Sequence, residues 1–270
     1  MTIKVAIIGC GRMGKDIASR VLDEQDLELV AAVDAVGTPF AGEDIGVLST
    51  GKPCGVEVRG ADKLGEVLEE SKPDVVVDFS TANAVPRNTQ TVVSHQANLV
   101  IGTTGYIKDQ LNQIKDSINT SQAGAVISPN MGIGVNVFWK IIQQAAKTLN
   151  DFDIEIIETH HRFKKDAPSG TALKTAQLIA ESIGADLDEN ATYGRQGEAP
   201  RKKKEIGIHA VRGGDIIGDH TVLFATLGES IEITHRAQSR DAFVNGVLLA
   251  VRFIHGKQGI YGMDQVLGLD

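Results

Sequence analysis

Near its start the chain reads Ile3-Lys4-Val5-Ala6-Ile7-Ile8-Gly9-Cys10-Gly11-Arg12-Met13-Gly14, and this stretch decides the fold. The β-branched apolar run predicts a buried strand, and three glycines follow it in the spacing G-x-G-x-x-G. Apolar residues then recur at helical spacing from Ile17 to Leu22. A second predicted strand, Leu27 to Val33, ends at Asp34, 20 positions after Gly14. The order strand, glycine turn, helix, strand and acid is typical of a dinucleotide-binding unit.

Each part of this unit has a chemical use. The first glycine permits a tight turn, the second lets the backbone approach a pyrophosphate, and the third lets helix and strand pack closely. The acid can accept hydrogen bonds from the adenosine ribose hydroxyls. We therefore expect the segment 9–14 and Asp34 to bind NADH or NADPH. The alternative is a glycine-rich turn in a fold that binds nothing there.

Asp34 also bears on the choice between the two coenzymes. A carboxylate near the ribose opposes a 2′-phosphate, and the next residue is Ala35 rather than a cation. We therefore expect NADH to be used at least as well as NADPH. Arg12 could still reach a 2′-phosphate, so use of NADPH stays open.

The alternation of strands and helices continues through the first half. Strands are predicted at 75–79, 98–101 and 125–127, and the last two end in Gly102-Thr103-Thr104-Gly105 and Ser128-Pro129-Asn130-Met131. Ligands of open parallel sheets bind beyond the carboxyl ends of the strands. The fold class predicted is α/β, with a Rossmann-type doubly wound parallel sheet in a dinucleotide-binding domain, residues 1–130. The alternative for both turns is an ordinary strand-to-helix connection.

The second half has a different pattern. A long helix at 132–149 leads to a strand at 153–158, and a further helix is predicted at 169–183. Three strands then follow without intervening helices, at 205–211, 221–226 and 230–234, before a closing helix at 241–255. Such an order predicts a mixed or antiparallel sheet. We assign residues 131–240 to a second, α+β domain.

The segment His160–Ala172 carries the chemistry of this second half. It places two imidazoles and three cations within six positions, ahead of the turn Pro168-Ser169-Gly170-Thr171 and a helix. Imidazole suits proton transfer near neutral pH, and a helix start offers N–H groups and a positive dipole to an anion. The segment predicts a site where a small acidic substrate receives a proton. A solvated basic loop is the alternative.

Composition limits the other possibilities. The formal charge of −8 argues against general nucleic-acid binding, because a polyanion would be repelled. The polar stretch 185–204 contains the basic run 201–204, and because no aromatic residues interleave with that run, we expect a mobile surface loop rather than a nucleic-acid patch. Two cysteines, no signal peptide pattern and no membrane-length apolar run predict a cytoplasmic protein. We expect no metal site, since His209, His220 and His235 lack companions at ligand spacing and are expected to be structural or surface residues.

Three stretches together resemble the dihydrodipicolinate reductases, now called 4-hydroxy-tetrahydrodipicolinate reductases, of the diaminopimelate route to lysine. These stretches are 9–14, 102–105 and 160–172, and the last, extended to Glu158, is highly specific. Supporting matches lie at 130–136, 212–220 and 232–237. The resemblance covers essentially the whole chain. The glycine loop is one residue tighter than in some members, and Ala35 replaces a cation found in others.

The resemblance implies NAD(P)H-dependent reduction of 4-hydroxy-tetrahydrodipicolinate to tetrahydrodipicolinate by a homotetramer. The second domain, residues 131–240, would bind the substrate and form the assembly, and the C-terminal part, 241–270, would return to the nucleotide domain. It implies that His160 is the proton donor and Lys164 its partner. The residues implied to hold the substrate carboxylates are His161, Lys164, Ser169, Gly170 and Thr171. The residues implied to contact the cofactor are Gly9, Cys10, Gly11, Arg12, Met13, Gly14, Asp34, Gly102, Thr103, Thr104, Ser128, Pro129, Asn130 and Met131.

Two other functions stay open. One is a regulator that binds NAD(H) without turnover, although a sensor needs no proton donor. The other is a different two-domain dehydrogenase, such as one acting on an amino-acid semialdehyde, with a differently placed lysine and a preference for a monocarboxylate.

Overall fold

The computed structural model describes residues 2–269 and divides the chain into two compact units. The first unit contains the residues up to Ile133 together with those from Phe243 onward, and the second spans Gly134–Ala242. The two units are described separately below. In the described part of the chain, no helix is both long and apolar enough to cross a membrane.

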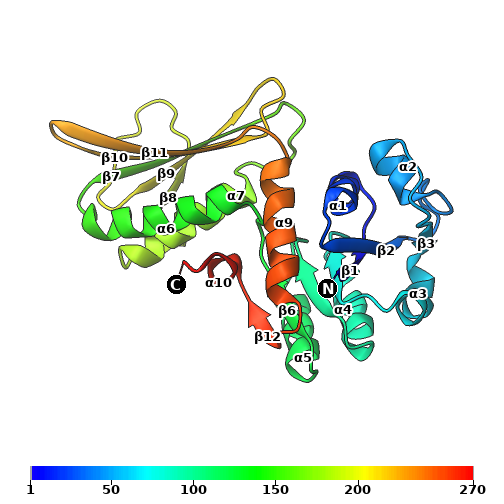
Figure 1. The fold of residues 1–270 in the computed structure, drawn as a ribbon. Helices are drawn as coiled ribbons and strands as arrows, with labels where there is room; N and C mark the ends of the chain where they lie inside the picture. Colours follow the sequence, from blue (N-terminus) through cyan, green and yellow to red (C-terminus); the bar gives the residue numbers. More distant parts are fainter. Residues whose placement is uncertain (1, 270) are drawn as a thin grey trace. The chain divides into compact units, whose positions relative to one another are not determined.

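The first unit is built on a seven-stranded sheet in the order β12-β6-β5-β4-β1-β2-β3 (Figure 1). All its strand pairs are parallel. The chain lays β1, β2 and β3 outward in one direction and then returns to β4 on the other side of β1, which makes the β1–β4 boundary a topological switch point. The predicted Rossmann-type sheet is confirmed. Its strands are β1 (Ile3–Ile8), β2 (Leu27–Asp34), β3 (Val58–Gly60), β4 (Val75–Asp78), β5 (Asn98–Ile101), β6 (Gly124–Ile127) and β12 (Gly259–Tyr261).

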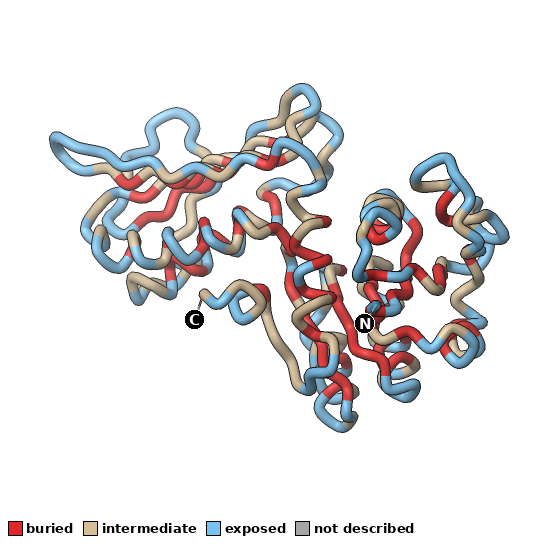
Figure 2. Tube along the Cα trace, in the orientation of Figure 1, coloured by how far each residue is buried: buried red, intermediate tan, exposed pale blue. Residues whose placement is uncertain are grey.

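Helices cover both faces of this sheet. The strands are buried throughout because alternate residues enter two different cores: Val5 and Ile7 of β1 pack into one, Ala6 and Ile8 into the other. Figure 2 shows the buried residues following the strands of the sheet. The helical elements are α1 (Arg12–Asp23), α2 (Ile45–Thr50), η1 (Ala61–Lys63), α3 (Leu64–Ser71), α4 (Val85–Ser94), α5 (Lys108–Asn119), α9 (Asp241–Ile254) and α10 (Met263–Leu267).

The second unit has a five-stranded sheet in the order β11-β10-β7-β9-β8. The β7–β9 and β8–β9 pairs are parallel, whereas β10 pairs antiparallel with both β7 and β11. The predicted mixed sheet is therefore confirmed. Its strands are β7 (Asp153–His160), β8 (Ala191–Tyr193), β9 (Ile206–Arg212), β10 (Gly218–Thr226) and β11 (Glu229–Ala237).

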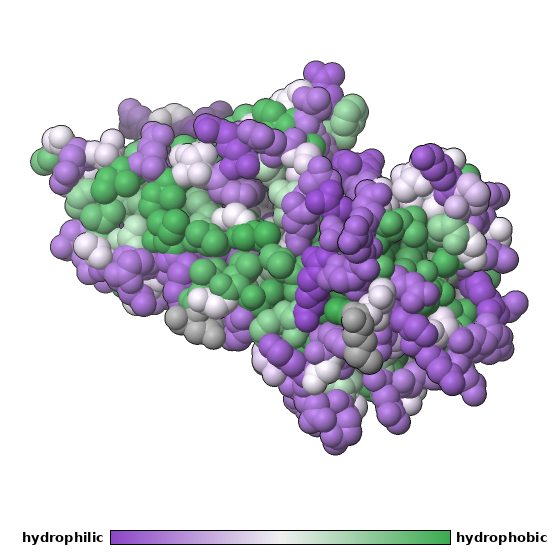
Figure 3. Space-filling view, viewed as in Figure 1, coloured by the Kyte–Doolittle hydropathy of each residue, from purple (hydrophilic) through white to green (hydrophobic). Residues whose placement is uncertain are grey.

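One face of this mixed sheet is covered by α6 (Ile133–Thr148) and α7 (Gly170–Ser182). Ile154 and Ile156 of β7 pack there with Phe138, Ile142 and Ile179. Not all of the apolar surface is enclosed: Figure 3 shows apolar residues gathered over α6 on the face in view, and Val137 and Ile141 of that helix are exposed.

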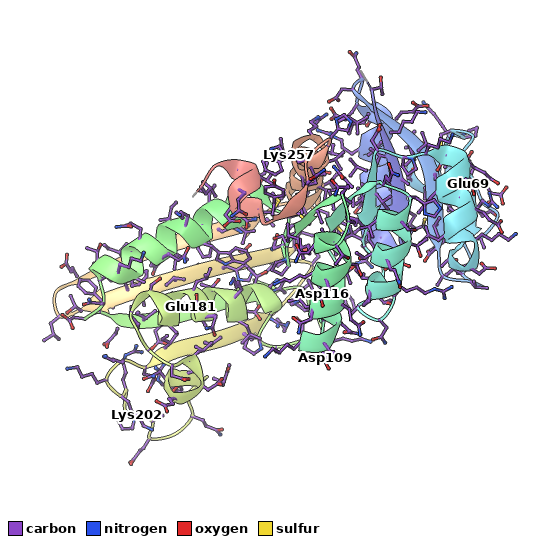
Figure 4. All side chains as sticks on the ribbon, turned by 90° about the horizontal axis from the view of Figure 1, so that it is seen from below. Glu69, Asp109, Asp116, Glu181, Lys202 and Lys257 are labelled. Carbon is purple, nitrogen blue, oxygen red and sulfur yellow. The ribbon has the colours of Figure 1, made fainter. Side chains whose placement is uncertain are left out.

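The stretch 185–204 differs from the structureless loop that its polar composition suggested. It contains the short helix α8 (Leu187–Asn190) and the edge strand β8. Each is under five residues long, which is too short for a periodic pattern to predict it. Arg201 is anchored by ion pairs with Asp153 and Glu155, while Lys202 lies on a loop that extends away from the sheet (Figure 4). The basic run is thus only partly a free surface loop.

Candidate active site

The glycine turn between β1 and α1 is shaped by close backbone contacts. Gly9 has φ +93°, and a Cβ on it would lie 2.6 Å from the Phe79 carbonyl oxygen. A Cβ on Gly14 would overlap the carbonyl oxygen of Gly9. A Cβ on Gly11, by contrast, meets nothing within 4 Å among the described residues. Gly9 and Gly14 therefore allow close backbone packing in the turn, whereas Gly11 leaves one side of the turn open, without a side chain.

That open side faces a pocket at the switch point between β1 and β4. The pocket has a volume of about 520 Å³ and is lined by segments 11–14, 79–82 and 102–104. Gly11 caps α1 with its backbone alone, so the N–H groups of the first turn of α1 are not masked by a capping side chain. Gly102 faces the Phe79 ring, which a Cβ at position 102 would overlap. The structure thus brings the predicted segments 9–14 and 102–104 together.

Asp34 lies at the end of β2 and is fixed by the backbone around it. Its Oδ2 accepts a hydrogen bond from the N–H of Cys10 at 3.2 Å, and its Oδ1 accepts one from Ala35 at 2.7 Å. Burial raises the pKa of the Cys10 thiol to about 12, so this cysteine serves as a small filler rather than a nucleophile. These features fit a dinucleotide. The start of α1 is positive and carries no capping side chain, a Cβ cannot be accommodated at Gly9 or Gly14, and the Asp34 carboxylate is held in place on the neighbouring strand.

The segment 128–131 lies after β6 and is not among the residues that line this pocket. It forms a tight turn in which Ser128 Oγ donates to the Asn130 carbonyl at 2.8 Å and the Gly132 N–H donates to Asn130 Oδ1 at 2.9 Å. Met131 is buried in the core with α9, whereas Pro129 is exposed.

In the second unit, His160 ends strand β7 with its side chain on the buried face of the sheet. Its Nδ1 lies 2.6 Å from Oε2 of Glu158, which is completely buried two residues earlier on the same face. The guanidinium of Arg212 donates to both oxygens of this carboxylate, each at 2.8 Å. The ring of His220, from β10, meets the His160 ring edge-on with centroids 5.3 Å apart.

These contacts act on the proton affinity of His160 in opposite directions. Burial lowers the pKa of His160, the Glu158 carboxylate raises it, and Lys164 and Arg212 lower it, with a net shift downward. Burial lowers the pKa of His220 to about 3, so this ring is neutral near pH 7. His160 is therefore neutral in the unliganded protein at neutral pH, and a nearby anion would favour its protonation.

The turn after β7 carries the remaining cations. Lys164 Nζ lies 3.0 Å from Asp166 Oδ1, and the Lys164 side chain is largely shielded from solvent. His161 stacks at a tilt on Phe163, and its buried Nδ1 has no hydrogen-bond partner within residues 2–269. Burial is the main cause of the lowered pKa of His160, and the charge of Lys164 lowers it further.

The start of α7 is built by Ser169. Its Oγ accepts the N–H of Ala172 at 3.2 Å, an N-cap, and its own N–H donates to Glu158 Oε1 at 2.9 Å. Gly170 opens the helix, and a Cβ there would meet nothing within 4 Å among the described residues. Thr171 follows in the first turn. His160 and the Ser169-Gly170-Thr171 start are thus joined through one carboxylate.

Several residues of these two sites escaped the sequence analysis. Glu158 carries a readable signal, because it lies two positions before His160 in a strand and must share its face. Arg212 and His220 reach His160 only through strand pairing across more than 50 positions, so no local pattern reveals them. The sequence pattern predicts only a strand end at Phe79, whereas in the structure this residue lines the pocket and its ring faces Gly102.

Comparisons with known proteins cover the whole chain. Residues 3–131 match the model "Dihydrodipicolinate reductase, N-terminus", and residues 134–267 match "Dihydrodipicolinate reductase, C-terminus". The 4-hydroxy-tetrahydrodipicolinate reductase of Methanothermobacter thermautotrophicus is 50% identical over 99% of this chain and 100% of its own length. The enzyme of the same name from Methanocaldococcus jannaschii is 51% identical over 99% of this chain and 98% of its own length.

A solved structure agrees with these matches. The dipicolinate-bound dihydrodipicolinate reductase from Paenisporosarcina sp. TG-14 superposes with a TM-score of 0.78 at 31% identity, covering 99% of this chain and 100% of the other. Both halves of the chain, and both sets of site residues, fall within these matches. The chain therefore belongs to the dihydrodipicolinate reductase family.

Proposed function

We propose that this chain reduces 4-hydroxy-tetrahydrodipicolinate to tetrahydrodipicolinate, with NADH or NADPH, in the diaminopimelate route to lysine. The observation that carries the proposal is the junction at Glu158, where a buried imidazole and the start of α7 meet on one carboxylate. A proton donor and an anion-binding helix start are what a small dicarboxylate that must be protonated requires. Membership of the reductase family supports the same reaction.

The first unit is proposed to hold the nucleotide, and the fit of its pocket supports this. Its residues 1–130, with 241–270 returning to it, would form the dinucleotide-binding domain. When bound, the reduced nicotinamide supplies the hydride. The residues proposed to hold the cofactor are Gly9, Cys10, Gly11, Arg12, Met13, Gly14, Asp34, Gly102, Thr103, Thr104, Ser128, Pro129, Asn130 and Met131.

NADH is proposed to be used at least as well as NADPH. Both oxygens of Asp34 accept backbone N–H groups, which keeps the carboxylate at the end of β2, and Ala35 beside it offers no cation to a 2′-phosphate. The ratio of kcat/KM for the two coenzymes tests this directly. A preference for NADPH of about tenfold, or 1.4 kcal/mol, would contradict it.

The second unit, residues 131–240, is proposed to hold and protonate the substrate. His160 would give its proton to the substrate carbon that becomes nucleophilic after reduction, and Lys164 would support it. His161, Lys164, Ser169, Gly170 and Thr171 would hold the two carboxylates through charge-assisted hydrogen bonds. The bound dianion would also offset the downward shift in the pKa of His160 and favour the imidazolium.

The experiment is an assay with enzymatically made substrate, following oxidation of the reduced nicotinamide. His160→Ala should lower kcat by about 10²- to 10⁴-fold, the range for loss of a general acid, and leave NADH affinity unchanged. Lys164→Ala should raise KM and lower kcat. Dipicolinate should compete with the substrate, whereas a semialdehyde dehydrogenase or a non-catalytic regulator would not show this inhibition. Full turnover by His160→Ala would remove the proposed donor.

The chain is also proposed to work as a cytoplasmic homotetramer assembled through the second unit. Exposed apolar side chains there support an assembly surface, since Val137 and Ile141 of α6, Val211 of β9 and Ile231 of β11 all face solvent in the isolated chain. Sedimentation equilibrium tests the mass, and a monomer at micromolar concentration would contradict the assembly.

A further inference from the structure

Glu158 contacts both parts of the proposed substrate site in the second unit, the His160 ring and the start of α7. Its side chain is 0% exposed, and four hydrogen bonds reach it. Oε1 accepts the Ser169 N–H at 2.9 Å and one Arg212 nitrogen at 2.8 Å. Oε2 takes the other Arg212 nitrogen at 2.8 Å and faces His160 Nδ1 at 2.6 Å. Both carboxylate oxygens are therefore fully engaged.

These partners keep Glu158 ionised. Burial raises the pKa of Glu158, but the hydrogen bonds from Arg212, His160 and the Ser169 N–H outweigh burial, and the net shift is downward. An ionised carboxylate has acceptors only. The proton in the 2.6 Å contact must therefore lie on His160 Nδ1, which leaves Nε2 as the nitrogen that exchanges a proton with the substrate.

The surroundings of the ring preserve access to Nε2. A Cβ built on Gly218 of β10 would lie 3.0 Å from Nε2, so only glycine leaves that nitrogen uncrowded on this side. The neutral His220 ring packs edge-on against the imidazole. The ring is thus held at Nδ1 by Glu158 and packs against β10, which leaves Nε2 as the nitrogen that can transfer a proton.

The same carboxylate determines where α7 begins. Its contact with the Ser169 N–H positions the N-cap residue of that helix. Arg212 Nη2 also donates to the Asp166 carbonyl at 2.7 Å, which ties the turn 161–168 to the same group. Donor, turn and helix start are therefore held at fixed separations by one buried ion pair.

We propose that Glu158, clamped by Arg212, is a positioning residue that selects the Nδ1–H tautomer of His160 and holds it in register with the start of α7. This inference rests on the proposed function and names a residue that acts through His160 rather than on the substrate. In the transfer, Nε2–H gives its proton to the substrate carbon, and the ring returns to the neutral Nδ1–H form. No other group needs to gain or lose a proton.

The pH dependence involves the groups packed around His160. Burial lowers the pKa of the imidazole, Glu158 of β7 raises it, and Lys164 of the turn and Arg212 of β9 lower it. Asp166 pairs with Lys164, and His220 of β10 is neutral. His235 of β11 lies beyond His220 and has a lowered pKa because of burial. Removing the Glu158 charge therefore leaves the lowering effects of burial, Lys164 and Arg212, so the pKa of the ring should fall further.

The kinetic test compares Glu158→Gln with Glu155→Gln. Glu155 is the matched control, because it lies on the opposite face of β7 and also binds a histidine and arginines, namely His209 at 2.7 Å, Arg195 and Arg201. We expect Glu158→Gln to lower kcat by about 10²-fold or more, to leave KM for NADH unchanged, and to move the alkaline limb of kcat/KM to lower pH. Glu155→Gln should keep the wild-type kcat and pH profile. Equal profiles for wild type and Glu158→Gln would overturn the inference.

The tautomer can be read without any turnover. In ¹⁵N-histidine NMR spectra, with His160→Ala for assignment among the seven histidines, wild-type His160 should show a protonated Nδ1 and a bare Nε2 above its pKa. Glu158→Gln should shift it toward the Nε2–H form, because the introduced amide can donate to Nδ1. A wild-type Nε2–H tautomer would overturn the inference even if Glu158→Gln does not fold. A wild type with the Nδ1–H tautomer but no reductase activity would instead contradict the proposed function alone.

Discussion

At the scale of single residues, the glycine turn shows that residues of the same type can have different roles. Gly14 is required by packing, since any side chain there collides with the carbonyl of Gly9. Gly11 is free of such contacts, and its missing side chain matters only to what occupies the pocket in front of α1. Gly14 therefore supports the fold, whereas Gly11 keeps the pocket open for the proposed nucleotide.

This difference predicts opposite results for two alanine variants. Gly14→Ala should reduce the free energy of unfolding by about 3 kcal/mol, the upper end of the cost of overpacking. Gly11→Ala should change it by less than about 1 kcal/mol, because only the N-cap residue type changes. Gly11→Ala should nevertheless weaken NADH binding by about tenfold or more. Urea unfolding and fluorescence titration measure the two effects, and unaltered NADH affinity in Gly11→Ala would contradict the role of the open side.

At the scale of secondary structure, the alternation of inward-facing and outward-facing residues along β7 also affects the start of α7. Residues 154, 156, 158 and 160 of β7 face inward, and the first two are isoleucines in the core while the last two are Glu158 and His160. An acid and an imidazole on the buried face of a strand need partners, and the start of α7 supplies one of them. The start of α7 and the proposed proton donor therefore both depend on the same strand.

Removing the side chain that caps α7 should destabilise the protein more than removing a hydroxyl elsewhere in the same helix. Ser169→Ala deletes the oxygen that accepts the Ala172 N–H, so we expect a loss of about 1 kcal/mol in the free energy of unfolding and a higher KM for the substrate. Ser182→Ala, at the other end of α7, removes only a bond to the Leu178 carbonyl and is the control. Thermal unfolding and steady-state kinetics suffice. If both variants behave alike, the cap has no special part in the site.

At the scale of the whole molecule, the two units differ in how their stability should respond to acid. Burial lowers the pKa values of His160, His220 and His235, and all three lie in the second unit. A histidine in the unfolded chain titrates near pH 6.5, so at lower pH the unfolded state binds more protons than the folded state. Each of these groups therefore stabilises the fold above about pH 6.5, and that stability is lost as the pH falls.

We expect the second unit to open first as the pH is lowered from about 6.5 to 4.5. For His220 the loss continues to about pH 3, whereas Asp26 and Asp44 of the first unit, whose pKa values are lowered by hydrogen bonds, act only below the ordinary range for Asp, about pH 4. Hydrogen exchange at several pH values should show amides of 134–242 losing protection before those of the first unit. His220→Leu should flatten the dependence. Equal loss of protection in both units would contradict this account.

The local patterns of the chain were enough to predict most of its secondary structure. The runs 98–101 and 3–8 were placed with the boundaries that the structure has, because short apolar runs with several β-branched residues, ended by glycine, favour a buried strand. Short elements such as β3, β8 and β12 were missed, since three residues carry no period. The segment 185–204 was misjudged for the same reason.

The sequence alone was therefore sufficient to predict the fold class and the glycine turn, and to propose the segment around His160 as the catalytic one, because each depends on residues that are close together along the chain. Only the tertiary structure could bring Arg212 and His220 to that imidazole and Phe79 to Gly102. Strand pairing decides those contacts, and pairing depends on register across the whole sheet rather than on any local pattern. The tautomer proposed for His160 follows from the buried ion pair that this register creates.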